Sequence, residues 1–158
     1  MKILLTAGAI VAVSLLLYFF VYTPLQKTEI NEDVPVAETQ GTATTSGGAS
    51  EAITSPRVPI KDTSIHPASG FVRIIDDGEK RYLRYEDLNT INGPDLFVYL
   101  ATETSAEDFI NLGPLKATNG SFNYEIPEGT DLSKYSQALI WCKAFGVLFN
   151  SADLKPLL

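Results

Sequence analysis

The hydrophobic and polar positions along this chain divide it into three segments with different patterns. The first runs from Ile3 to Tyr22, "ILLTAGAIVAVSLLLYFFVY", and contains no charged residue. About twenty apolar residues are the length that a helix needs to cross a bilayer, and the aromatic residues at the end of the run favour the membrane–water interface. No small-x-small cleavage pattern follows the run. We therefore expect residues 1–22 to form an uncleaved, single-pass transmembrane anchor, with a cleaved secretory signal as the alternative.

The second segment, residues 23–60, has no sustained hydrophobic period. It is rich in Thr, Ser, Gly, Ala, Pro and acidic residues, a composition that buries too little apolar surface to offset the conformational entropy of the chain. We expect a disordered linker, which as a flexible coil would have an end-to-end distance of roughly 30–35 Å. Because this long segment after the anchor is acidic and polar, we expect the body of the chain on the extracytoplasmic side of the cell membrane.

The third segment, residues 61–158, shows the two-residue alternation of β-strands. "GFVRII" and "RYLRYEDL" flank an Asp-Gly turn in "DDGEK", which predicts a hairpin. The runs "DLFVYLA", "SFNYEI", "QALIWCK" and "GVLF" are further strands between turns, whereas "SAEDF" and "DLSKY" each predict a brief helical turn with a Ser or Asp cap. "ALIWC" is apolar on both faces, as in a central strand. The predicted fold class is all-β: a single antiparallel β-sandwich or barrel-like domain after an N-terminal transmembrane helix and a disordered linker.

The charge of the chain excludes one class of partner. With 12 Lys and Arg against 19 Asp and Glu, the formal net charge is −7 at pH 7. Nucleic-acid binding needs clustered positive charge that displaces counterions, and the sequence contains no such cluster. On the same ground, we expect an anionic membrane surface to be a poor partner for the domain.

Site chemistry is limited because the chain has one Cys and one His. A single thiol cannot close an internal disulfide, and the pair cannot supply the four ligands of a structural zinc site, so we predict no metal site. The haem-attachment, Walker, zincin and nucleophile-elbow motifs are absent from the sequence. The candidates that remain are Cys142 and His66. Cys142 is either a small apolar residue of the core or a reactive thiol, and strand alternation places Trp141 and Lys143 on the opposite face.

Three separated motifs resemble one known family. "NGPDLFVYLA", "LGPLKATNGSFNYEIPEGTDLSKY" and "ALIWCKAFGVLFNSADL" occur in the order found in the DM-thirteen domain, also called the electron transfer DM domain, and "HPASGFVRI" resembles the opening of that domain. The resemblance covers the chain from about His66 to Leu154. It implies an extracellular β-rich domain with a redox role for a Cys near its end, either as a bare thiol or as a ligand to a group such as haem. Carried over, that role falls on Cys142, with His66 as its companion.

Two functions remain open after these observations. In the first, the domain is a membrane-tethered redox component that passes electrons through Cys142 to a partner protein at the cell surface. Its cofactor is unknown: a haem or metal bound through the thiolate is compatible with this role, and the sequence requires neither. In the second, the domain is a non-catalytic β-sandwich that binds a partner at the cell surface, and Cys142 only packs. Both describe a redox accessory or a binding module more than a stand-alone enzyme.

Overall fold

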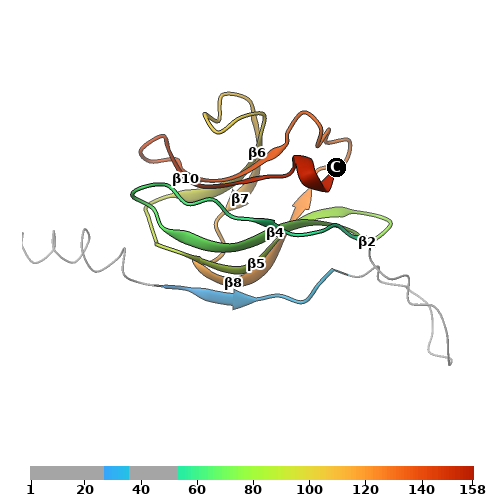
Figure 1. The fold of residues 1–158 in the computed structure, drawn as a ribbon, viewed down its shortest axis with the longest axis horizontal. Helices are drawn as coiled ribbons and strands as arrows, with labels where there is room; N and C mark the ends of the chain where they lie inside the picture. The colour runs from blue at the N-terminus through green and yellow to red at the C-terminus, as the bar shows by residue number, and fades with distance from the viewer. Residues whose placement is uncertain (1–26, 36–52) are drawn as a thin grey trace, which may run out of the picture.

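Two stacked β-sheets make up the fold (Figure 1). The computed structural model describes residues 27–35 and 53–158. Within this part of the chain the one helical element is the short 3-10 turn η2 (Lys155–Leu157), and no helix is long and apolar enough to cross a membrane. The all-β sandwich is therefore confirmed, whereas the expected anchor, residues 1–22, lies outside the described residues.

The larger sheet has the strand order β1-β8-β5-β4-β2, with β3 also paired to β4, and the smaller sheet has the order β10-β9-β6-β7. The larger sheet consists of β1 (Glu29–Asn31), β2 (Ile53–Thr54), β3 (Val58–Pro59), β4 (Ala68–Asp76), β5 (Arg81–Thr90) and β8 (Asn119–Ile126). The smaller sheet consists of β6 (Leu96–Ala101), β7 (Phe109–Pro114), β9 (Gln137–Cys142) and β10 (Val147–Asp153). Neighbouring strands are antiparallel except β1 and β8, which run parallel.

β4 and β5 form the hairpin that the sequence predicts. In its turn, Asp77 Oδ1 accepts hydrogen bonds from the N–H groups of Glu79 and Lys80, and Gly78 has a φ of 93° that few other residues adopt. The backbone hydrogen bonds from Lys80 and Glu79 outweigh burial and hold the pKa of Asp77 below its ordinary value. The ionised side chain therefore stabilises this turn.

The hydrophobic core lies between the two sheets. Strand alternation sends every second side chain inward, and the inward side chains of both sheets form one buried cluster. This cluster includes Val72 and Ile74 of β4, Leu83 and Tyr85 of β5, Phe122, Tyr124 and Ile126 of β8, and Val98, Leu100, Ile140 and Cys142 of the smaller sheet. A second cluster, built on Tyr99, Ala101 and Leu139, lies on the outer face of the smaller sheet.

The smaller sheet agrees with the sequence in its centre and differs at its edge. β9 is a central strand between β10 and β6, as the apolar residues on both of its faces predict. The edge strand β7 was not predicted: in "FINLGP" only Ile110 and Leu112 face the core, both half-buried, and the apolar Phe109 at an exposed position obscures the alternation.

Neither of the predicted helical turns is a helix. Residues 105–109 form a turn and bend that lead into β7, and residues 131–135 form a single hydrogen-bonded turn. Asp131 does cap that turn, because its Oδ1 accepts hydrogen bonds from the N–H groups of Ser133 and Lys134. One turn makes too few hydrogen bonds to offset the cost of helix nucleation. The conformation of both segments is therefore determined by the strands that they connect.

The expectation of a disordered linker over residues 23–60 is wrong for the part that the structure describes. β1 pairs with β8, and β2 and β3 pair with β4 at the opposite edge of the same sheet. Ile30 packs against the core, and Val58 and Ile60 are buried in it. The sheet edges supply hydrogen-bond partners and apolar contacts that the composition of the segment does not reveal. Residues 36–52 lie outside the described residues.

Different loops form the two ends of the sandwich. The cysteine end consists of residues 61–67, 91–95 and 143–146, which precede β4, β6 and β10. The far end consists of residues 76–81, 102–108 and 127–136, and Arg81 there donates a hydrogen bond to Thr130 O at 2.7 Å. In Figure 1 the β9–β10 turn lies on the left and the β4–β5 turn on the right.

Candidate functional site

Cys142 is the last residue of β9 and faces the core. It pairs with Leu96 of β6 and with Val147 of β10, and it is completely buried, with 0% of its surface exposed. Its Sγ donates a hydrogen bond to the carbonyl oxygen of Pro94 at 3.1 Å. The thiol is therefore a packed member of the core with one polar partner.

A short loop, residues 91–95, covers Cys142 at the cysteine end. A Cβ on Gly93 would lie 2.5 Å from the Phe149 ring, so this close approach favours glycine. Asp95 has a φ of 56°, which is uncommon for a residue other than glycine, and its carbonyl accepts a hydrogen bond from Lys143 N at 3.0 Å. Because Cys142 is fully buried, a reagent can reach Sγ only when the structure around it opens.

His66 lies at the same end as Cys142 but does not contact it. Its ring stacks on Phe149, with centroids 3.8 Å apart and an interplanar angle of 15°, and its Nδ1 is 3.0 Å from Thr63 Oγ1. Its carbonyl oxygen accepts a hydrogen bond from the buried Asn150. His66 therefore anchors the start of the domain to β10, and Phe149 separates its ring from the loop that covers the thiol.

Trp141 and Lys143 point away from Cys142, as strand alternation predicts. Trp141 packs in the outer cluster of the smaller sheet, with its ring centroid 6.5 Å from that of Tyr99. Lys143 Nζ lies 5.2 Å from the centroid of Phe97, in the same cluster. Neither side chain can relay charge to the thiol by direct contact.

The described residues around Cys142 do not form a metal site, and the fully buried thiol has no exposed surface against which a haem could bind. Within the described residues, no group of three or more His, Cys, Asp or Glu side chains is placed to hold a metal ion. The one expected companion, His66, uses its ring face on Phe149 and its Nδ1 on Thr63. Among the described residues, a single chain therefore provides no second ligand for a metal bound to Cys142.

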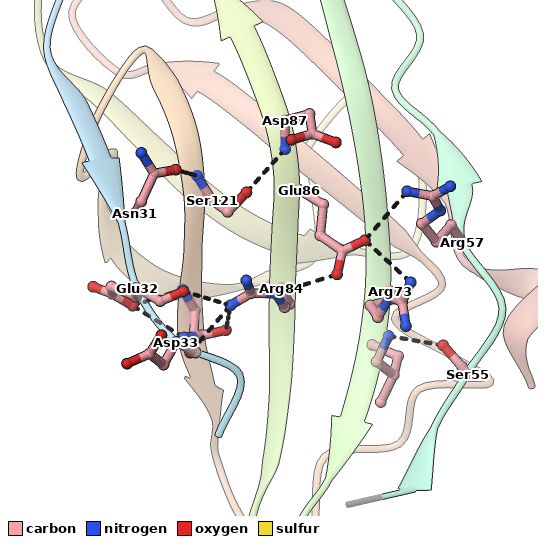
Figure 2. A network of polar contacts seen from close by, with 12 residues as sticks. Asn31, Glu32, Asp33, Ser55, Arg57, Arg73, Arg84, Glu86, Asp87 and Ser121 are labelled. Atoms are coloured by element: carbon pink, nitrogen blue, oxygen red, sulfur yellow. Dashed lines mark hydrogen bonds and ion pairs between the residues drawn. The ribbon is translucent and has the colours of Figure 1, made fainter. Parts of the chain in front are cut away.

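A polar network on the outer face of the larger sheet was missed from the sequence (Figure 2). Glu86 lies 3.1 Å from Arg73, 3.2 Å from Arg84 and 3.8 Å from Arg57. The Arg84 side chain is only 8% exposed. Its position on the polar face of "RYLRYEDL" gives no signal of this burial, because the segment that covers it comes from the expected linker.

The same network holds β1 in place. Arg84 Nη1 donates hydrogen bonds to the carbonyl oxygens of Glu32 and Asp33 and to Asn123 Oδ1. The Glu32 carboxylate accepts hydrogen bonds from Asn123 N and from Lys116 Nζ. Burial alone would raise the pKa of Glu32, but the hydrogen bonds from Lys116 and Asn123 lower it below its ordinary value. An ionised Glu32 therefore stabilises the docked strand.

Comparison with known protein families identifies the family of this chain. A family model described as "Electron transfer DM13" matches residues 60–154, a range that contains both His66 and Cys142. No curated protein and no solved structure matches the chain.

Proposed function

Because the chain belongs to the Electron transfer DM13 family, we propose that it is a membrane-tethered redox protein in which Cys142 changes oxidation state. Residues 1–22 hold it in the cell membrane, and the sandwich lies on the extracytoplasmic side. The observation that carries the proposal is the position of the only thiol of the chain. It is the last residue of β9, buried at one end of the core, and it is hydrogen-bonded to a five-residue loop.

The chemistry that one sulfur allows is thiol–disulfide exchange with a partner protein. The Cys142 thiol loses its proton, and the thiolate attacks a disulfide of the partner. The partner S–S bond breaks, a mixed disulfide with Cys142 forms, and the second partner sulfur leaves as a thiolate that takes up a proton. A thiolate of a second protein then attacks the Cys142 sulfur, which releases the first partner as a dithiol and forms a mixed disulfide between Cys142 and the second protein. Another thiolate of that protein attacks its own sulfur in this bond, closes a disulfide there and releases Cys142 as a thiolate, so two electrons pass from the second protein to the first. We derive no step through a haem or a metal, because Cys142 has no exposed surface for a haem and no second metal ligand beside it among the described residues.

The complete burial of Cys142 favours a second candidate, a non-catalytic binding module at the cell surface. Free cysteines are among the most frequently buried residue types, and a thiol that is hydrogen-bonded to a carbonyl is satisfied without any redox role. An unpaired thiol in an oxidising compartment is also protected by such burial. The two candidates differ in one measurable property, the reactivity of the thiol in the folded protein.

The test is the rate at which folded protein forms a mixed disulfide with oxidised glutathione, followed by mass. We expect one adduct on the full chain and none on Cys142→Ser. The rate should exceed the rate of global unfolding, because opening of residues 91–95 is sufficient. If the adduct forms only as fast as the whole domain unfolds, the redox role is refuted and the binding module stands.

A further inference from the structure

Exposed apolar side chains gather at the cysteine end of the sandwich. Six large apolar side chains are exposed in the described residues, and three of them belong to this end: Ile65 at 72%, Phe145 at 68% and Val147 at 39%. Ile65 and Phe145 are also the two most exposed of the six. Aromatic and aliphatic side chains on the tips of loops are typical of a surface that meets a lipid interface or a protein.

Charge is distributed unevenly between the two ends. The loops of the far end, residues 76–81, 102–108 and 127–136, carry eight carboxylates and three cationic side chains. The loops of the cysteine end carry two carboxylates and two lysines, and Lys27 lies beside them. The net charge of −7 therefore comes mainly from outside the cysteine end. An anionic surface repels the acidic far end, and this repulsion orients the far end away from that surface.

The chain enters the sandwich at the cysteine end. Lys27 Nζ donates a hydrogen bond to Asn89 Oδ1, at the end of β5, and Lys27 lines a shallow groove with Pro67 and Ser69, at the start of β4. β1 begins here and runs toward the far end (Figure 1). The membrane-proximal part of the linker is thus attached beside the loops that carry the exposed apolar side chains.

The length of free chain decides which end can reach the membrane. Four residues, 23–26, separate Tyr22 from Lys27, and even fully extended they place Lys27 within about 17 Å of the end of the span. β5 has ten residues, which correspond to roughly 33 Å. The tether therefore keeps the cysteine end close to the headgroup layer, whereas the far end can stand up to the length of β5 further out.

From these observations we propose that the cysteine end docks on the outer surface of the membrane that holds the chain. Phe145, Ile65 and Val147 enter the boundary between headgroups and acyl chains, and Lys27 and Lys143 lie at the level of the lipid phosphates. This inference rests on the proposed anchor. Docking turns the loop over Cys142 toward the bilayer, so a redox partner must approach it along the membrane plane.

The experiment places one tryptophan at either end of the full-length chain in lipid vesicles. Trp141 is replaced by Phe in both variants, and the probe is Phe145→Trp at the cysteine end or Glu79→Trp at the far end. Both sites are exposed turn residues, so the two variants are matched for fold. Vesicles contain phosphatidylcholine and phosphatidylglycerol, with or without lipids brominated near the start of the acyl chains, which quench only a nearby indole.

We expect bromolipids to quench the tryptophan at position 145 at least about threefold more strongly than the one at position 79, as for side chains that enter the interface. Equal and weak quenching of the two tryptophans, in protein that floats with the vesicles, refutes docking and leaves the anchor intact. The exposed apolar side chains of the cysteine end would then be a contact surface for a protein. Protein that does not float refutes the anchor and the docking with it, whereas the glutathione assay judges the redox role separately.

Discussion

Replacing Arg84 by Met should release β1 from the larger sheet while the rest of the sandwich stays folded. Met retains most of the length and apolar contact of the side chain. It removes four hydrogen bonds, two of which hold the carbonyl oxygens of Glu32 and Asp33. Since β1 itself is only three residues long, its own strand pairing is too short to keep it docked.

The size of the effect follows from these contacts. Breaking a buried ion pair costs about 3–5 kcal/mol when its partner is left unpaired, but Glu86 keeps Arg73 at 3.1 Å. Hydrogen bonds to a charged group contribute about 1.5–3 kcal/mol each and are not additive. We therefore expect the docking of β1 to weaken by about 3 kcal/mol, which makes the undocked state roughly a hundredfold more populated.

Native-state hydrogen exchange measures this release directly. The amide of Glu32 donates to Ser121 O at 2.7 Å, and in Arg84→Met it should exchange at least about a hundredfold faster. The amide of Ile140 in β9 should stay protected by the remaining global stability. Arg81→Met is the matched control, because Arg81 lies on the same strand but donates to Thr130 at the far end. If both variants change the protection of Glu32 equally, Arg84 does not hold β1.

Three further predictions concern the loop, the pH dependence and the domain boundary. Gly93→Ala should cost about 1–3 kcal/mol in urea unfolding, because its Cβ would meet the Phe149 ring, and it should speed the glutathione reaction by loosening the loop; unchanged reactivity would show that this loop is not the barrier. Since the pKa of Glu32 is lowered in the folded protein, the stability that it contributes is present above the ordinary glutamate pKa and is lost as the pH falls through the folded value. Glu32→Gln should flatten this acid limb in urea titrations, and an identical pH profile would contradict the assignment. A chain that begins at residue 61 should be less stable than one that begins at residue 53 by about 3 kcal/mol or more, because it lacks the buried Val58 and Ile60; equal unfolding midpoints would show that these residues are not part of the folding unit.

The docking of β1 changes the mechanical role of the linker. A coil over residues 23–60 would hold the domain away from the membrane and let it turn freely. With β1 paired to β8, only residues 23–26 remain between the expected span and the first docked residue, Lys27. The second part of the linker also ends on the same sheet, at β2 and β3. With residues 1–22 as the proposed anchor, the network around Arg84 would limit how far the domain can move from the bilayer.

The sequence by itself determined the central strands, because two-residue alternation is a local property of each segment. It predicted the β4–β5 hairpin from the Asp-Gly turn, the central position of β9 from its two apolar faces, and the opposite orientations of Trp141 and Cys142. The family was also recognisable, because its motifs lie within these strands and the turns between them.

Only the tertiary structure decided the edges of the sheets and the surroundings of the thiol. β1 is ordered by partners about ninety residues away, such as the contact of Glu32 with Asn123 at a separation of 91 residues, and no window of sequence contains both sides of it. For the same reason, neither the burial of Arg84 nor the lack of contact between His66 and Cys142 could be predicted from the sequence. The local sequence pattern predicts on which face of a strand a side chain lies. The depth of its burial and the identity of its partners depend on distant segments that folding brings together.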